Sequence, residues 1–161
     1  IILIGCKSLL ESQLLDLKCL FKINEIKSIK ESKKNVVNII NVDFTYKKIF
    51  SRVTIKSNSY IKECFDICLK ILKDNSKSIL INGPITKKTF LKKKYLGITE
   101  YLAKKTNKSG EIMLIYNEKL SVSPLTTHIP IKNVAKRISK KKIIKNTLEI
   151  KNFIKNILTK K

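Results

Sequence analysis

Short apolar runs that alternate with helical patterns constrain the fold of this chain more than any other feature of its sequence. Four such runs occur, at residues 1–4, 36–40, 78–81 and 112–116. Each is apolar enough to be a strand covered on both faces. Helices are expected over residues 8–20 and 61–72, the second with Ser59 as its N-cap. Strands that alternate with helices predict an α/β fold with a largely parallel sheet.

The C-terminal part of the sequence predicts a further amphipathic helix. Its apolar stripe recurs at helical spacing, at Ile143, Thr147, Ile150, Ile154 and Ile157. We expect this stripe to face the core and the lysines between its members to form a solvated face.

The start of the chain indicates a fragment. It has no initiator methionine and begins inside an apolar run with no basic segment before it, so we expect no signal peptide. We predict part of a first α/β domain at residues 1–90 and the start of a second α/β domain at residues 91–161. No run approaches the roughly 18–20 apolar residues of a membrane span, so we expect no membrane association.

A net charge of +23 raises the possibility of a nucleic-acid partner. Only Arg52 and Arg137 are arginines, however, and lysine lacks the planar fork that reads bases and phosphates. The excess of Lys, Ile and Asn also fits a bias toward AT-rich codons. We therefore do not expect nucleic acid as the partner, and a lysine-rich nucleic-acid-binding module stays as an alternative.

The four cysteines predict no metal or disulfide site. They are Cys6, Cys19, Cys64 and Cys68, and no pair has C-x-x-C spacing. We interpret them as small buried hydrophobes in a chain kept in the reducing cytoplasm.

The only histidine, His128, lies between Pro124 and Pro130. The prolines favour an extended, non-helical backbone, and such loops often display binding residues. Taken alone, His128 is more simply interpreted as an ordinary loop or core residue than as a ligand. Gly83-Pro84 follows the run at 78–81 and predicts either a plain breaker or a ligand-binding turn at the carboxyl end of a sheet.

Three segments together resemble a known family, the 4-hydroxythreonine-4-phosphate dehydrogenases of vitamin B6 biosynthesis. They are Ile81-Asn82-Gly83-Pro84-Ile85-Thr86-Lys87, Gly97-Ile98-Thr99-Glu100-Tyr101-Leu102-Ala103 and Thr126-Thr127-His128-Ile129-Pro130. The family carries "T-G/A-P-x-x-K", "G-H-T-E" and "T-T-H-x-P" in the same order and at similar spacing. The resemblance extends over most of the chain, which corresponds to roughly the first half of such an enzyme.

The resemblance implies the α/β/α layers of isocitrate and isopropylmalate dehydrogenases, incomplete in this fragment, and a cytoplasmic homodimer. It implies oxidation and decarboxylation of 4-phosphooxy-L-threonine to 3-amino-2-oxopropyl phosphate, with NAD and a divalent metal (Zn, Co or Mg) as cofactors. The fragment alone is expected to be inactive. A degenerate, non-catalytic remnant is a further alternative.

The resemblance also implies roles for three residues. His128 would be one of three histidines that bind the metal, with the other two beyond Lys161. Thr99 would bind the substrate, and Lys87 would help to attract its phosphate. No catalytic residue is assigned, and the residues that bind NAD would lie mostly in the missing half.

Ile98 departs from the family pattern, because it stands where the family has a histidine. Isoleucine can neither donate a hydrogen bond nor carry charge, so one polar contact with the substrate is missing. Lys87, Lys92 or Lys93 could supply a cation instead. The alternative substrate is another phosphorylated hydroxy acid, such as a phosphothreonate or a phosphoerythronate.

Overall fold

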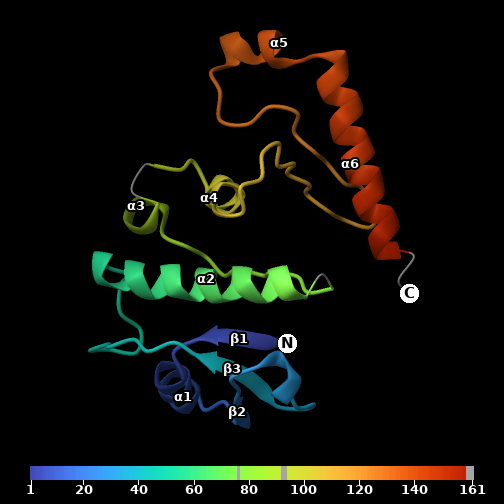
Figure 1. Cartoon of the computed structure of the whole chain (residues 1–161). Coiled ribbons are helices and arrows are strands. Elements are labelled where there is room, and N and C mark those ends of the chain that lie inside the picture. The colour runs from blue at the N-terminus through green and yellow to red at the C-terminus, as the bar shows by residue number, and fades with distance from the viewer. Residues whose placement is uncertain (76, 92–93, 159–161) are drawn as a thin grey trace. The chain divides into compact units, whose positions relative to one another are not determined.

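The computed structural model describes residues 1–75, 77–91 and 94–158 and shows two compact units, Ile1–Ile98 and Thr99–Lys161 (Figure 1). Three strands and six α-helices are assigned among the described residues: β1 (Ile2–Gly5), α1 (Lys7–Asp16), β2 (Ile23–Glu25), β3 (Val37–Asn41), α2 (Asn58–Asp74), α3 (Lys87–Phe90), α4 (Ile98–Lys105), α5 (Val134–Arg137) and α6 (Lys140–Leu158). Short 3₁₀ turns cover Ile29–Glu31, Ile55–Ser57 and Ile131–Asn133. The predicted domain division after residue 90 stays a prediction. Among the described residues, no helix has the length and apolar character needed to cross a membrane.

The first unit contains a small parallel sheet in the order β1-β3-β2. β3 is central, with Ile39 opposite Leu3 of β1 and Glu25 of β2. Its middle lies in the core, because Ile39 is only 1% exposed. The predicted mixed α/β class with a parallel sheet is therefore confirmed, and so are the strands expected at residues 1–4 and 36–40.

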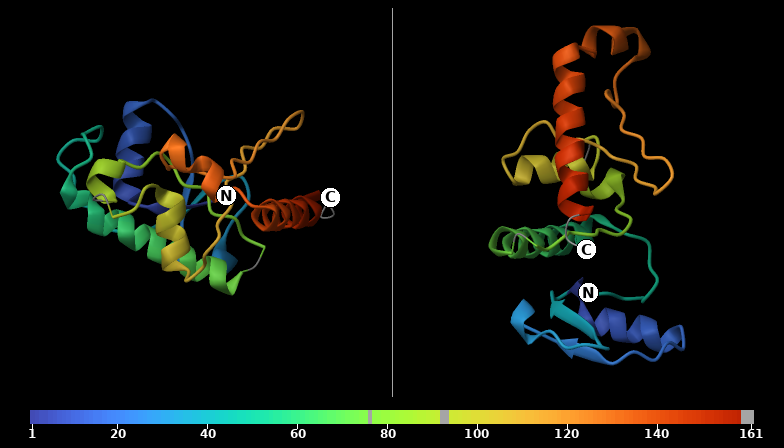
Figure 2. Two further views of the ribbon diagram at one scale, coloured as in Figure 1. Left: turned by 90° about the horizontal axis from the view of Figure 1, so that it is seen from above. Right: turned by 90° about the vertical axis from the view of Figure 1, so that its right-hand side faces the viewer.

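Two helices pack against this sheet. α1 contacts β3 and α2 contacts β1. Two further views show how these elements are arranged (Figure 2). α2 is amphipathic, as its apolar spacing predicts, and it buries Phe65 against the ring of Phe90 at a centroid distance of 5.9 Å. Beside Phe90, Leu91 is also buried, so α3 joins the core of the first unit.

A buried amide supports the strand connection that precedes β3. Asn38 is 3% exposed, and its Oδ1 accepts hydrogen bonds of 2.9 Å from Asn24 Nδ2 and from the backbone N–H of Lys33. Its Nδ2 donates to the Lys33 carbonyl, also at 2.9 Å. Because all three bonds join β3 to residues that precede it, Asn38 fixes the course of the chain between β2 and β3.

Two of the predicted strands are wrong. The structure assigns no strand over residues 78–81, where Ile79 and Ile81 are 79% and 86% exposed. In the run at 112–116, only Ile115 pairs, in an isolated antiparallel bridge with Val122. An apolar run becomes a strand only when a neighbour completes its hydrogen bonds, and no described strand lies beside either run.

Helix boundaries also differ from the predictions. α1 ends at Asp16 rather than near residue 20, because Lys18 takes a left-handed conformation with φ of 54°. The N–H groups of Lys18 and Cys19 then bond back to Leu15 and Leu14, which closes the helix end. Ser59 is not an N-cap, since α2 begins at Asn58 directly after a 3₁₀ turn.

The apolar stripe of α6 is not core-facing as predicted. Of the residues 140–156, whose side chains the structure describes, none is buried. Ile143 is 46% exposed, whereas Ile150 and Ile154 are half-buried, and Ile157 has no described side chain. Helical spacing identifies an apolar face, but the amount of burial depends on what packs against that face.

The four cysteines are free thiols that differ in how deeply they are buried. Cys6 is buried, as predicted, while Cys19, Cys64 and Cys68 are half-buried. Burial raises the pKa of the Cys64 thiol to about 11. A thiol with a raised pKa is protonated near neutral pH and is therefore a poor nucleophile and metal ligand.

Candidate functional site

A pocket of about 500 Å³ in the second unit brings two of the predicted segments together. Thr99, the predicted substrate contact, lines it from the first turn of α4. Thr126 and Thr127, which directly precede His128, line it from the loop before α5. Segments more than twenty residues apart in the sequence thus place threonines on the lining of one cavity.

The loop that carries Thr126 and Thr127 is fixed at both ends by hydrogen bonds. Before it, Ile115 and Val122 exchange backbone bonds of 2.8 and 2.9 Å. The hydroxyl of Ser123 donates to the Met113 carbonyl at 2.8 Å. After it, the N–H of Asn133 bonds to the Pro130 carbonyl at 2.9 Å, which starts the 3₁₀ turn that leads into α5. The threonines therefore sit on a short loop between two anchored ends.

His128 lies in this loop with a left-handed backbone, at φ of 55°. Its side chain is exposed, and it is not among the residues that line the pocket, although Thr127 and Ile129 on either side are. A left-handed backbone costs energy for any residue other than glycine, and strain of this kind is concentrated at functional sites. The exposed imidazole is open to a ligand from outside the second unit.

Among the described residues, no group of three His, Cys, Asp or Glu side chains could hold a metal ion. His128 fits a metal as one neutral nitrogen ligand, whereas a catalytic zinc site usually takes three protein ligands. The described chain therefore offers one donor to such a site and not a complete set. The role of His128 as a metal ligand stays a prediction.

Lys87 and Ile98 do not line this pocket. Lys87 is the exposed first residue of α3, within the first unit. Ile98 is the half-buried first residue of α4, directly before Thr99. Lys92 and Lys93 lie outside the described residues. The substrate roles of Lys87 and Thr99 both stay predictions.

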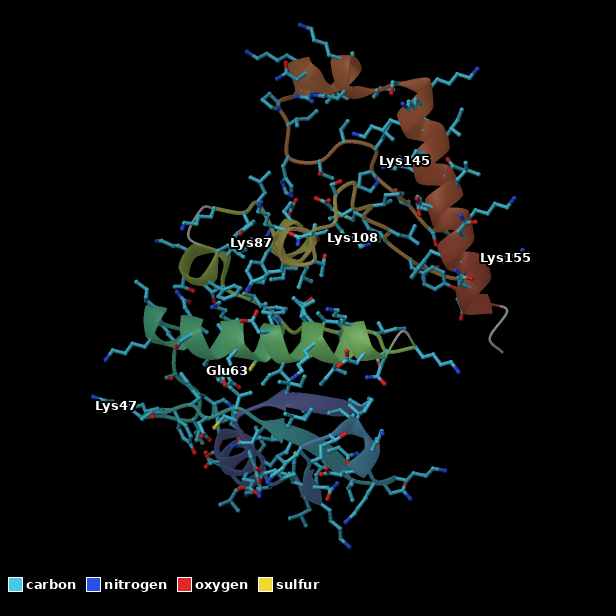
Figure 3. The ribbon with its side chains drawn as sticks, in the orientation of Figure 1. Lys47, Glu63, Lys87, Lys108, Lys145 and Lys155 are labelled. Carbon is cyan, nitrogen blue, oxygen red and sulfur yellow. The ribbon has the colours of Figure 1, made fainter. Side chains whose placement is uncertain are left out.

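Five charged residues that the sequence patterns did not single out also line the pocket. They are Glu100, Glu111, Arg137, Lys142 and Lys145. Lys145 lies on α6, where helical spacing had suggested only a solvated lysine face (Figure 3). The one available signal was Glu100, which belongs to the "G-x-T-E" segment together with Thr99.

Comparisons with known proteins point to one family. The family model for "Pyridoxal phosphate biosynthetic protein PdxA" matches residues 1–161. A 4-hydroxythreonine-4-phosphate dehydrogenase of Sulfurihydrogenibium sp. (strain YO3AOP1) is 31% identical over 127 residues, covering 76% of this chain and 38% of that protein. One from Aquifex aeolicus (strain VF5) is 47% identical over 51 residues, covering 32% of this chain and 16% of that protein.

Solved structures show the same fold. The crystal structure of 4-hydroxythreonine-4-phosphate dehydrogenase from Klebsiella pneumoniae matches with a TM-score of 0.80 at 19% identity, covering 96% of this chain and 49% of that one. A structure of such an enzyme from Burkholderia phymatum matches with a TM-score of 0.73 at 20% identity, covering 89% of this chain and 45% of that one. The chain thus spans about half of these solved chains and less than half of the curated relatives it matches.

Proposed function

The chain belongs to the family of the pyridoxal phosphate biosynthetic protein PdxA, and from this premise we propose that the full-length protein is a 4-hydroxythreonine-4-phosphate dehydrogenase. The proposed substrate is 4-phosphooxy-L-threonine. The match of the family model to residues 1–161 carries the proposal. The pocket supports it, because Thr99 and the Thr126-Thr127 pair line one cavity.

The proposed reaction has two steps. A hydride leaves the carbon that bears the secondary hydroxyl and passes to NAD⁺, and the hydroxyl loses its proton, so a ketone forms. The resulting β-keto acid then loses its carboxylate as CO2, and a proton replaces it to give 3-amino-2-oxopropyl phosphate. In this scheme Thr99 holds the substrate by a hydrogen bond, and Lys87 attracts its phosphate.

A divalent metal, Zn, Co or Mg, is part of the proposal. His128 would supply one ligand, and the others would come from residues outside the described chain. When bound, the metal would act as a Lewis acid toward the substrate oxygens. The exposure of the imidazole and its left-handed backbone support this role.

The assembly is proposed on the same basis. We expect a cytoplasmic homodimer with the α/β/α layers of isocitrate and isopropylmalate dehydrogenases. The residues that bind NAD would lie mostly outside this chain. The described chain alone is expected to be inactive, because it offers one metal donor and not a set.

Ile98 favours a second candidate substrate. An isoleucine at the start of α4 cannot donate a hydrogen bond next to Thr99, so one polar contact is missing. Losing a hydrogen bond to a charged group costs about 1.5–3 kcal/mol. A related dehydrogenase of phosphothreonate or phosphoerythronate is therefore the alternative.

Steady-state kinetics on the full-length protein tests these candidates. With NAD⁺ and each divalent metal in turn, 4-phosphooxy-L-threonine is expected to yield NADH. The absence of NADH with every metal would overturn the proposal. NADH from phosphoerythronate but not from 4-phosphooxy-L-threonine would establish the alternative.

A further inference from the structure

Asn82-Gly83 is the only Asn-Gly pair in the sequence, and it lies in the segment between α2 and α3 (Figure 1). Both residues are exposed, and neither belongs to a helix or a strand. Within the part of the chain that the structure describes, no hydrogen bond between backbone groups involves residues 79–85. The peptide that joins Asn82 to Gly83 can therefore change its conformation without breaking secondary structure.

The side chain of Asn82 is folded toward the residue that follows it. Its Nδ2 donates a hydrogen bond of 3.0 Å to the Gly83 carbonyl, which is its one hydrogen bond among the described residues. An added Cβ on Gly83 would meet no atom within 4 Å, so no other element crowds this position. Because glycine has no side chain to shield its nitrogen, the backbone nitrogen of Gly83 is open to approach by Asn82 Cγ.

The charges along this part of the chain are all positive. Asp74 and Glu100 are the nearest acidic residues on either side of the pair, and every charged residue between them is a lysine. The backbone nitrogen of Gly83 becomes a nucleophile only after its N–H has lost a proton. Nearby positive charges favour the negatively charged form of a group, so the lysines favour this deprotonation.

We propose that Asn82 is a site of spontaneous deamidation. The Gly83 nitrogen gives its proton to solvent and bonds to Asn82 Cγ. The bond from Cγ to Nδ2 then breaks, and the leaving nitrogen takes up a proton and departs as ammonia, which leaves a succinimide ring. Water adds to one of the two ring carbonyls and opens the ring, so that residue 82 becomes aspartate or isoaspartate. In sum, water is consumed and ammonia is released, with no oxidant or reductant.

Deamidation changes both the charge and the backbone of this segment. The new carboxylate is the first negative charge between Asp74 and Glu100, and it lies among lysines that attract it. Isoaspartate also adds the former side-chain methylene to the main chain, which lengthens the connection between α2 and α3. The inference rests on the exposed Asn-Gly pair and not on the proposed reaction, so either can fail without the other.

Ageing of the full-length protein in neutral and in mildly alkaline buffer tests the inference. Peptide mass spectrometry locates aspartate and isoaspartate, and an isoaspartyl methyltransferase with labelled S-adenosylmethionine counts the isoaspartate. A synthetic peptide of residues 78–87 gives the rate without any folded structure. Asn58-Ser59 is the internal control, since it lies at the start of α2 and Asn58 Nδ2 is bonded to the Thr89 carbonyl at 3.1 Å.

Asn82 in the folded protein should deamidate within about tenfold of the peptide rate, faster at the higher pH, while Asn58 stays intact. Gly83→Ala should slow the reaction at least about tenfold, because its Cβ shields the attacking nitrogen. The fold accepts this Cβ, since no atom lies within 4 Å of it and Gly83 does not have a positive φ. Asn82→Gln should also slow the reaction, because the longer side chain closes a less favourable ring.

Two results would overturn the inference. The first is a rate at Asn82 more than about tenfold below that of the peptide, which would mean that the folded protein protects the pair. The second is deamidation of Gly83→Ala at the wild-type rate, which would exclude attack by this nitrogen. Neither result bears on the formation of NADH from 4-phosphooxy-L-threonine, so the proposed reaction is tested separately.

Discussion

The backbone N–H of Cys6 donates a hydrogen bond of 2.9 Å to the phenol oxygen of Tyr60. This bond ties the residue that precedes α1 to the first turns of α2, 54 positions further along the chain. The ring of Tyr60 also stacks on Phe44 at a centroid distance of 4.7 Å. Two helices and the carboxyl end of β1 therefore meet at one phenol.

Gly5→Ala should destabilise the protein through this phenol. A Cβ on Gly5 would lie 3.0 Å from Tyr60 Oη, which cannot retreat without weakening its bond to Cys6. Overpacking of this kind costs about 1–3 kcal/mol. Chemical denaturation measures the loss in the free energy of unfolding.

Tyr60→Phe provides the background that isolates the cause, because it removes the crowded oxygen. In that background Gly5→Ala should cost less, so that a double-mutant cycle shows coupling. Gly83→Ala is the control, since nothing lies within 4 Å of the added Cβ. Equal costs of Gly5→Ala in both backgrounds would contradict the assigned contact.

Alkaline pH should destabilise the first unit through the same region. Burial raises the pKa of Tyr60 to about 12 and that of the Cys64 thiol to about 11, above their usual values of 10.0 and 9.0. As the pH rises past the usual values, the unfolded chain loses these protons first. The folded chain then binds more protons, so stability that is complete below about pH 9 falls toward pH 12.

Denaturation of the wild type and of Tyr60→Phe across this range measures the effect. The decline above about pH 10 should be shallower for Tyr60→Phe, because that variant has no phenol to ionise. Tyr116→Phe, at an exposed position, serves as the control. A decline in Tyr60→Phe as steep as that of the wild type would refute this assignment.

Asn38→Ala should destabilise the first unit without changing the charge of the protein. The substitution leaves the N–H and carbonyl of Lys33 and the amide of Asn24 without the partner they share. Unsatisfied buried polar groups cost about 1–3 kcal/mol. Thermal unfolding should show a clear decrease for Asn38→Ala and none for the exposed Asn152→Ala. An unchanged midpoint for Asn38→Ala would show that water replaces the lost bonds.

Replacement of His128 separates ligand loss from backbone strain. Both His128→Ala and His128→Gly remove the imidazole, so both should lower divalent-metal binding by the full-length protein. Only glycine takes a φ of 55° without the roughly 1–2 kcal/mol cost of a left-handed residue. His128→Gly should therefore be at least as stable as His128→Ala. Metal binding at the wild-type level in both variants would exclude the ligand role.

The elements that could be predicted from the sequence are those whose partners follow from the sequence itself. β1 and β3 are apolar runs that pair with each other, and α2 buries a face that its periodicity defines. β2 was missed because its three residues have no clear pattern, and their strand geometry comes from pairing with β3. The strand predicted at 78–81 is wrong for the opposite reason. Its apolar pattern is strong, but no described strand pairs with it.

The candidate site was predictable only in part, for a related reason. Segment order pointed to Thr99, Lys87 and His128, of which only Thr99 lines the pocket. Thr126 and Thr127, from the same segment as His128, line it as well. Helical spacing could assign Lys142 and Lys145 to a polar face, but it could not predict which residues pack beside that face. Arg137, in a helix of four residues, has no periodicity from which to predict a role.

The central place of β3 determines the order in which the sheet can form during synthesis. Both strands that pair with it, β1 and β2, precede it in the chain and do not pair with each other. Neither strand can pair with β3 until the residues up to Asn41 have emerged from the ribosome. Until then their backbone groups stay unpaired, and strand edges of this kind are prone to aggregate. These three strands therefore pair only after β3, the last of them in the chain, has been made.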